Sequence, residues 1–183
     1  EEERLSRLKH TNWFPTHAVR ACLAAAGLRP HEVEAFVYYA DAGMAQRELL
    51  DYFLNDPGGI DLWSPPHILA DALSRASGSD VDPSRCHFLH HHEAHAWSAF
   101  AMAGQASALV MTVDGEGDGV AGRFYVGTRD AARVRLEPLA TIGAAQSIGH
   151  FYRQLMNVIG FRYFEEYKVM GLAPYGDAAR YRG

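Results

Sequence analysis

The stretch that decides the fold is ALVMTVD at residues 108–114, followed directly by GEGDG at residues 115–119. An almost continuous apolar run of this length is typical of a central strand of a sheet. The glycines that follow it predict a tight turn, and the next two candidate strands are GRFYVG at residues 122–127 and the stretch at residues 134–140. Because short connections containing glycine favour a meander, we expect antiparallel strands at 108–114, 120–128 and 132–140 in that order.

A helix is predicted directly after this sheet, over residues 147–159, with Gly160 closing it. Its apolar residues recur at helical spacing, which predicts one buried face packed on the sheet. The residues expected on that face are Ile148, Phe151, Tyr152, Leu155, Met156 and Ile159.

The first half of the chain alternates between predicted helices and short strands, which favours the α/β class. Residues 16–26, 45–54, 65–77 and 91–103 have helical patterns, with a turn at 56–59 after the second of them. Residues 33–40 predict a buried strand, and 86–90 a short one. We place the boundary between the two halves at residues 105/106.

Composition excludes several classes of protein. The chain has 183 residues, of which 48% are hydrophobic and 21% charged, so global disorder is excluded. Its formal net charge of −5 does not resemble a nucleic-acid footprint, and no apolar run is long enough to cross a bilayer. The only cysteines, Cys22 and Cys86, form no C-x-x-C pair, so a reducing cytosol is the expected location. Because the chain starts at Glu1 rather than Met, we expect a fragment of a longer enzyme.

The densest chemical feature is the run HHHEAH at residues 90–95. If a helix starts near His91, then His91 and His95 lie four residues apart on one face, and His92 points elsewhere. Two imidazoles at this spacing can bind one metal ion, with bonds of about 2.1 Å. The run is not H-E-x-x-H, so a zinc protease is excluded. The alternative is a surface cluster or a histidine that caps the helix.

The turn after the central strand is the second candidate. Asp114 ends the strand, where its carboxylate can hold a metal or orient a hydroxyl. Gly115, Gly117 and Asp118 follow, and exposed amides in such a turn can cradle a phosphate. We therefore consider these three as candidate cofactor-binding residues and Asp114 as a catalytic and metal-binding candidate. The alternative is an ordinary hairpin turn.

The third candidate is Lys168, in the run EEYKVMGLAPYG at residues 165–176. It either contacts a phosphate as a point charge or forms a salt bridge with a neighbouring acid. In the first case Lys168 is a catalytic and cofactor-binding residue. It should then face the same cleft as the histidine pair and the glycine-rich turn.

Taken together and in order, four stretches carry a family resemblance: EEERLSRLKH, HHHEAHAWSAF, VMTVDGEGD and EYKVMGLAPYG. The chain resembles the O-carbamoyltransferases of the NodU/CmcH family over nearly its whole length. The resemblance implies parts of two lobes of an RNase H-like, actin-like ATPase (ASKHA) fold with mixed sheets. Residues 1–105 would end the first lobe and residues 106–183 would begin the second.

The same resemblance implies a two-step reaction in the cytoplasm. Carbamoyl phosphate and ATP, the latter with magnesium, would yield a carbamoyl-adenylate. A YrdC-like domain would then pass the carbamoyl group to a hydroxyl of a natural product or sugar. In such families an iron-type divalent ion, with zinc or manganese as alternatives, is bound at positions that carry over to His91, His95 and Asp114.

Several parts of that family are absent from this sequence: its opening strands, a later nucleotide loop, a further aspartate ligand and the YrdC-like domain. The fragment alone is therefore not expected to complete the reaction. Two alternatives stay open, an actin-like binding module without transfer activity and a tRNA threonylcarbamoyl-type modification enzyme. The acidic net charge disfavours the second, because tRNA attracts basic surfaces. No nucleic-acid or membrane partner is expected.

Overall fold

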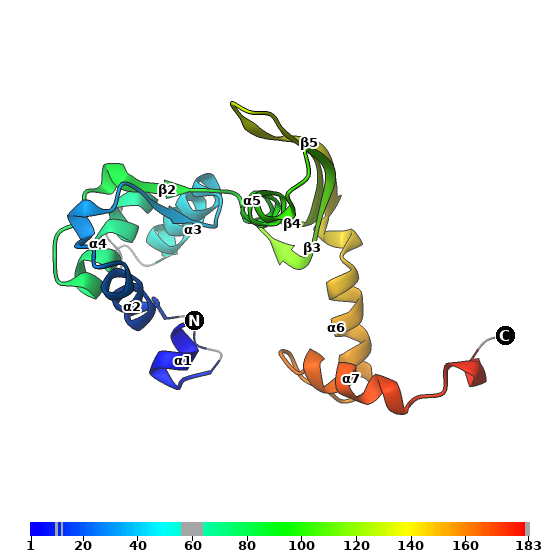
Figure 1. Ribbon diagram of the computed structural model, residues 1–183. Coiled ribbons are helices and arrows are strands. Elements are labelled where there is room, and N and C mark those ends of the chain that lie inside the picture. Colours follow the sequence, from blue (N-terminus) through cyan, green and yellow to red (C-terminus); the bar gives the residue numbers. More distant parts are fainter. Residues whose placement is uncertain (10, 12, 56–63, 182–183) are drawn as a thin grey trace. The chain divides into compact units, whose positions relative to one another are not determined.

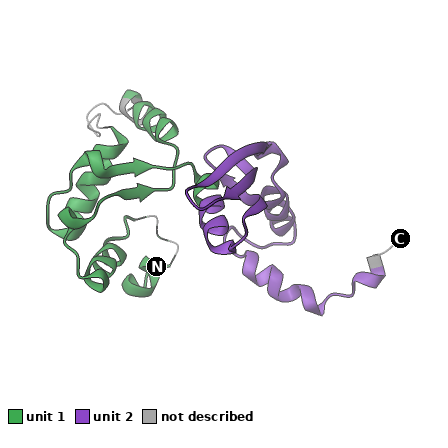
Figure 2. Cartoon of the chain, turned by 45° about the horizontal axis from the view of Figure 1, so that its top comes forward, with its two compact units in different colours: residues 1–94 green, residues 95–183 purple. Residues whose placement is uncertain are grey.

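The computed structural model describes residues 1–9, 11, 13–55 and 64–181. The chain forms two compact units, Glu1–Ala94 and His95–Gly183 (Figure 2). This boundary differs from the one expected at residues 105/106, because most of the helix that precedes residue 105 packs on the sheet of the second unit. The turn expected at 56–59 lies outside the described residues.

The first unit contains a small parallel sheet and its helices (Figure 1). Its elements are α1 (Glu2–Ser6), α2 (Thr16–Ala26), β1 (Phe36–Tyr38), α3 (Ala42–Asn55), α4 (Pro65–Ser77) and β2 (Cys86–Phe88). Strand β1 pairs in parallel with β2, and α3 and α4 lie between them in the chain. The core joins α4 to β2 through four buried residues, Ala70, Leu73, Val81 and Cys86.

Strand β1 corrects one expectation. The buried strand predicted at 33–40 is confined to Phe36–Tyr38, and Val37 and Tyr38 are 63% and 41% exposed. Among the described residues β1 pairs with β2 alone, so β1 lies at the edge of a sheet of two strands. β-branched and aromatic content therefore predicted the strand conformation here but not its burial.

The second unit is built on an antiparallel sheet, in the order β3-β4-β5. Its elements are α5 (His91–Ala103), β3 (Ser107–Gly117), β4 (Val120–Arg129), β5 (Val134–Gly143), α6 (Ile148–Val158) and α7 (Glu166–Leu172). The predicted meander is confirmed in strand order and direction. The boundary between the units falls after the first turn of α5, which is one continuous helix.

Helix α5 packs closely on the sheet. Ala96 and Phe100, four residues apart on one face, form a core with Val110 of β3 and Tyr125 of β4. A Cβ atom at Gly127 would lie 2.7–2.9 Å from the Phe100 ring. The helix can therefore approach β4 this closely because position 127 has no side chain.

Helix α6 corrects a second expectation. Of the face predicted to be buried, only Met156 is buried, whereas Ile148, Phe151 and Ile159 are 60–69% exposed. In Figure 1, α6 leaves the sheet beside β3 and extends away from it. Its periodicity was a correct guide to which residues share a face, but periodicity carries no information on what covers that face.

The α/β class is confirmed, since both units combine helices with a small sheet. The described sheets are not mixed: one is parallel and the other antiparallel. The helical crossover between β1 and β2 permits parallel pairing, whereas the short links between β3, β4 and β5 require antiparallel pairing. No helix in the described part of the chain has the length and apolarity needed to cross a bilayer.

Candidate metal centre

The first turn of α5 presents two histidines on one side. His91 begins the helix, and the spacing of four residues places His95 on the same face. The buried side of the helix is a different one, occupied by His92, Ala96 and Phe100 at successive spacings of four. His92 has no exposed surface, which agrees with the expectation that it does not join the pair. Packing of that buried side therefore fixes the direction in which His91 and His95 point.

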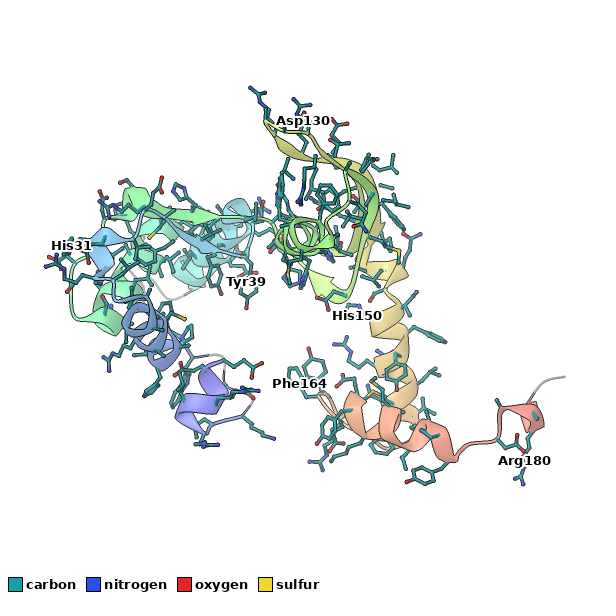
Figure 3. The ribbon with its side chains drawn as sticks, in the orientation of Figure 1. His31, Tyr39, Asp130, His150, Phe164 and Arg180 are labelled. Atoms are coloured by element: carbon teal, nitrogen blue, oxygen red, sulfur yellow. The ribbon has the colours of Figure 1, made fainter. Side chains whose placement is uncertain are left out.

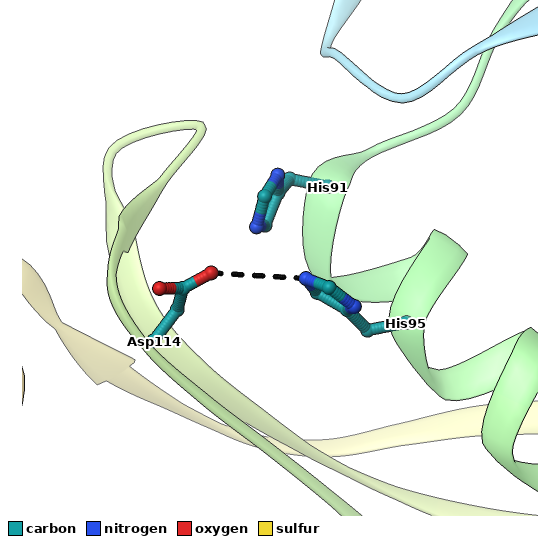
Figure 4. Close-up of side chains that lie close together, drawn as sticks. All are labelled: His91, His95 and Asp114. Atoms are coloured by element: carbon teal, nitrogen blue, oxygen red, sulfur yellow. Dashed lines mark ion pairs between the residues drawn. The ribbon is translucent and has the colours of Figure 1, made fainter. Parts of the chain in front are cut away.

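Asp114 reaches the same place from β3 because the strand is interrupted there. Val113 pairs with Gly122 and Gly117 pairs with Val120, so residues 114–116 stand opposite the single residue Ala121. Such a bulge releases a short stretch from the strand ladder and re-aims its side chains. The Asp114 carboxylate accepts a hydrogen bond from the Gly115 amide at 2.7 Å through Oδ1. Its other oxygen, Oδ2, lies 3.7 Å from Nε2 of His95 (Figure 4).

The three side chains converge on one point. Each of His91, His95 and Asp114 offers one ligand atom, and these atoms lie within 4.8 Å of one another. Ligands bound to one ion at about 2.1 Å lie roughly 3–4 Å apart, so small side-chain rotations would complete the site. The His95 and Asp114 side chains are 55% and 43% exposed, so both lie at the surface and not in the packed core.

The donor set fits a divalent transition metal. Two imidazoles and one carboxylate are the ligands of many iron(II) sites with open positions, and zinc and manganese accept the same donors. A groove of about 420 Å³ runs between α5 and β3 and is lined by His95, Ser98, Met111 and Asp114 among others. Remaining coordination positions would therefore be open to a substrate.

The glycine-rich run forms a hairpin as well as a bulge. Asp118 and Gly119 have φ angles of 50° and 78°, as in the two-residue turns that join antiparallel strands. Gly117 is buried within the strand pair. Of the three candidates in this turn, Gly115 alone lines an open hollow of about 870 Å³, together with Asp114 and Glu116. The phosphate-binding role assigned to Gly115, Gly117 and Asp118 stays a prediction.

Lys168 lies on α7 and pairs with its neighbour. Its Nζ atom is 2.5 Å from Oε1 of Glu165, and both side chains are partly exposed. The hydrogen bond between them raises the pKa of Lys168 and lowers the pKa of Glu165. Glu166 and Met170 of the same helix line the hollow beside Asp114, whereas Lys168 is not among the residues that line it. The described partner of Lys168 is thus the acidic neighbour, and its contact with a phosphate stays a prediction.

Sequence reasoning missed the residues that support Asp114 from α6. Ser147 is buried at the start of that helix, and its hydroxyl contacts the bulge. His150, labelled in Figure 3, lies on α6, and its Nε2 atom is 3.6 Å from Oε2 of Glu116 in the bulge. A serine directly before a helix was the available signal, but it predicts a cap and not a second partner.

Comparisons with known proteins agree with the family resemblance. The chain matches the Carbamoyltransferase N-terminus family over residues 1–181, and it belongs to that family. It is 38% identical over 182 residues to the Nodulation protein NolNO of Sinorhizobium fredii. It is also 45% identical over 94 residues, 51% of the chain, to the Nodulation protein NolO of Bradyrhizobium diazoefficiens.

The relatives are considerably longer than this chain. The match to NolNO covers 100% of the chain and 26% of that protein. An uncharacterized protein of Synechocystis, sll1178, is 29% identical over 97% of the chain and 31% of its own length. The chain therefore spans about a quarter to a third of these relatives.

Proposed function

We propose that this chain is the metal-binding part of an ATP-dependent O-carbamoyltransferase. The observation that carries the proposal is the convergence of His91, His95 and Asp114 in a chain of the Carbamoyltransferase N-terminus family. The complete enzyme would hydrolyse carbamoyl phosphate to carbamate and phosphate, and the carbamate would react with ATP to give a carbamoyl-adenylate and pyrophosphate. Transfer of the carbamoyl group to an acceptor hydroxyl would then release AMP.

The chain's own residues would hold and orient the ion. His91 and His95 are fixed by one helix, and Asp114 is fixed by a bulge in a strand packed against that helix. Iron is the expected metal, with zinc and manganese as alternatives. When bound, the ion would neutralise and orient phosphoryl oxygens during adenylyl transfer. Lys168 would add a further positive charge toward the phosphates if it exchanged Glu165 for a substrate.

The remaining steps would depend on further parts of the complete protein. We propose that the two units belong to lobes of an actin-like ATPase fold, with which their small α/β form is compatible. Transfer would take place on a YrdC-like domain elsewhere in the polypeptide. The greater length of the relatives leaves room for such a domain.

A sugar or natural product is the acceptor class we favour. Two of the similar proteins are named nodulation proteins, and these are more than a third identical to this chain where they match. The formal charge of −5 disfavours a polyanionic acceptor such as tRNA.

The test uses the full-length protein that contains this chain. It is incubated with ATP, carbamoyl phosphate and candidate hydroxyl acceptors, and product masses and the metal content are measured. We expect a mass gain of one carbamoyl group on an acceptor. His95→Ala and Asp114→Asn should lose metal and product together. His87→Ala is the matched control, because His87 is an exposed histidine on β2 and should leave both unchanged.

The outcomes separate the competing functions. Metal retention without any carbamoyl product would indicate a binding module. Modification of tRNA would indicate the threonylcarbamoyl-type enzyme. Full activity in both His95→Ala and Asp114→Asn would overturn the proposed site.

A further inference from the structure

The start of α6 packs against the segment that carries Asp114. Ser147 is 5% exposed, and its hydroxyl donates a hydrogen bond to the Gly115 carbonyl oxygen at 2.6 Å. The same hydroxyl oxygen accepts from the His150 amide at 3.0 Å and so caps the helix. One side chain therefore ties the helix start to the backbone next to the metal-ligand candidate.

Gly149 brings the two backbones into contact. A Cβ atom at position 149 would lie 2.7 Å from Gly115 Cα, 3.0 Å from Gly115 N and 3.4 Å from the Asp114 carbonyl carbon. Backbone atoms cannot rotate aside as a long side chain can, so any side chain here would displace the bulge. The φ angle of Gly149 is not in the left-handed region, so close approach is the requirement that glycine meets here.

The backbone at Gly115 also holds the Asp114 carboxylate. The Gly115 amide, which a Cβ atom at position 149 would meet at 3.0 Å, is the donor to Asp114 Oδ1 at 2.7 Å. A shift of Gly115 would therefore move the hydrogen bond that orients the carboxylate. The bulge cannot hold this position by strand pairing alone, because residues 114–116 stand opposite only Ala121.

We propose that Ser147 and Gly149 are positioning residues for the metal site, which hold the Asp114 carboxylate toward the histidine pair through Gly115. This inference rests on the proposed metal-binding function. Groups that orient a metal ligand from behind typically change metal affinity by roughly 10- to 100-fold when they are altered. The expected loss for Gly149→Ala lies in that range.

The experiment compares two glycine-to-alanine variants in the full-length protein. Gly149→Ala lies in α6, and Gly171→Ala lies in α7, where a Cβ atom meets nothing within 4 Å. Alanine favours a helix over glycine at both positions, so helix propensity changes in the same direction. Dissociation constants for Co²⁺ alone are measured by its visible absorption, and amide hydrogen exchange is measured on the metal-free protein.

We expect Gly149→Ala to weaken Co²⁺ binding roughly 10- to 100-fold and to speed exchange at residues 113–117. Gly171→Ala should match wild type in both measurements. Ser147→Ala serves as the second variant if Gly149→Ala does not fold, and it should show the same two effects. Equal affinity and equal exchange in Gly149→Ala and wild type would overturn the inference.

The two proposals fail in different ways. If the wild-type protein binds no Co²⁺, the proposed metal function fails. The exchange measurement then still decides whether Ser147 and Gly149 hold the Asp114 segment. If wild type binds Co²⁺ and both variants bind it equally well, only the positioning role fails.

Discussion

Helices α5 and α6 both contact the sheet of the second unit. The apolar pattern of each helix predicts the opposite of the burial that the structure shows. Helix α6 has a clear apolar stripe, yet Met156 is its only buried residue. Helix α5 is rich in alanine with little stripe, yet Ala96 and Phe100 are almost fully buried. The difference teaches that close approach depends on small residues on both sides, such as Ala96 and Gly127, more than on the strength of the pattern.

The two helices also support the candidate site in different ways. Helix α5 carries two of the candidate ligands, and the helix packs on the sheet through Ala96 and Phe100. Helix α6 carries none of the candidate ligands, and residues at its start lie against the backbone beside the third candidate, Asp114. Substitutions on the packed α5 side and on the exposed side formed by α6 and α7 should therefore have different effects.

The largest expected effect comes from a matched pair of phenylalanines. Phe100→Ala removes a side chain that is 1% exposed, and it should lower the free energy of unfolding by about 3–5 kcal/mol. Phe151→Ala removes one that is 64% exposed, and it should change this energy by less than about 0.5 kcal/mol. Denaturant unfolding of both variants measures the difference. Equal losses would mean that the exposed face of α6 is covered in the protein in solution.

Gly127→Ala tests the close approach of α5 itself. The new methyl group would meet the Phe100 ring at less than 3 Å, and overpacking of this kind costs about 1–3 kcal/mol. The cost should largely disappear in a Phe100→Ala background, because the ring that the methyl group meets is gone. A double-mutant cycle by denaturant unfolding measures this coupling. Additive effects would show that Gly127 is needed for another reason.

Lys168→Ala tests whether Lys168, on α7, contributes to the proposed reaction. In the full-length enzyme we expect the KM for ATP or carbamoyl phosphate to rise, or kcat to fall, by roughly 10- to 100-fold, at 1.4 kcal/mol per decade. Folding should be nearly unaffected, because Lys168 is partly exposed. Steady-state kinetics and a melting curve are both required. Unchanged kinetics with a melting temperature several degrees lower would show that the lysine serves only as the partner of Glu165.

The smallest expected effect is the pH dependence of that ion pair. The pKa of Glu165 is lowered by Lys168, so the stabilising contribution is present above the ordinary glutamate pKa and is lost as the pH falls through the lowered value. The pKa of Lys168 is raised, so the contribution is present below the ordinary lysine pKa and is lost as the pH rises through the raised value.

Melting temperatures of wild type and Glu165→Gln test this directly. Their difference should stay constant at neutral pH and shrink below about pH 4.3 and above about pH 10.4. A difference that changes between pH 6 and 8 would instead implicate a histidine, since its ordinary pKa is roughly 6.5.

Much of the second unit could be predicted from sequence because its signals are local. The apolar run before Asp114 and the short glycine-containing links predict an antiparallel meander. The shared face of His91 and His95 also follows from helix geometry alone. Ser64 before α4 and Gly78 after it mark the ends of that helix for the same reason, because caps depend on neighbouring residues.

Sequence could not decide the features that depend on non-local contacts. The burial of 33–40 and of the α6 face depends on what packs against them, which periodicity does not contain. The position of Asp114 beside His95 depends on the pairing register of β3 with β4. This register is interrupted at residues 114–116. Lys168 has acidic neighbours within reach, so its sequence alone could not choose between Glu165 and a phosphate.

The bulge in β3 has a consequence for how such sequences diverge. Three residues of β3 face one residue of β4 there, so a chain two residues shorter at this point could pair its strands without interruption. Such a deletion would keep the hairpin and remove the carboxylate position beside the histidines. The candidate site would therefore depend on the length of this segment, whereas the strand pairing on either side of it would not.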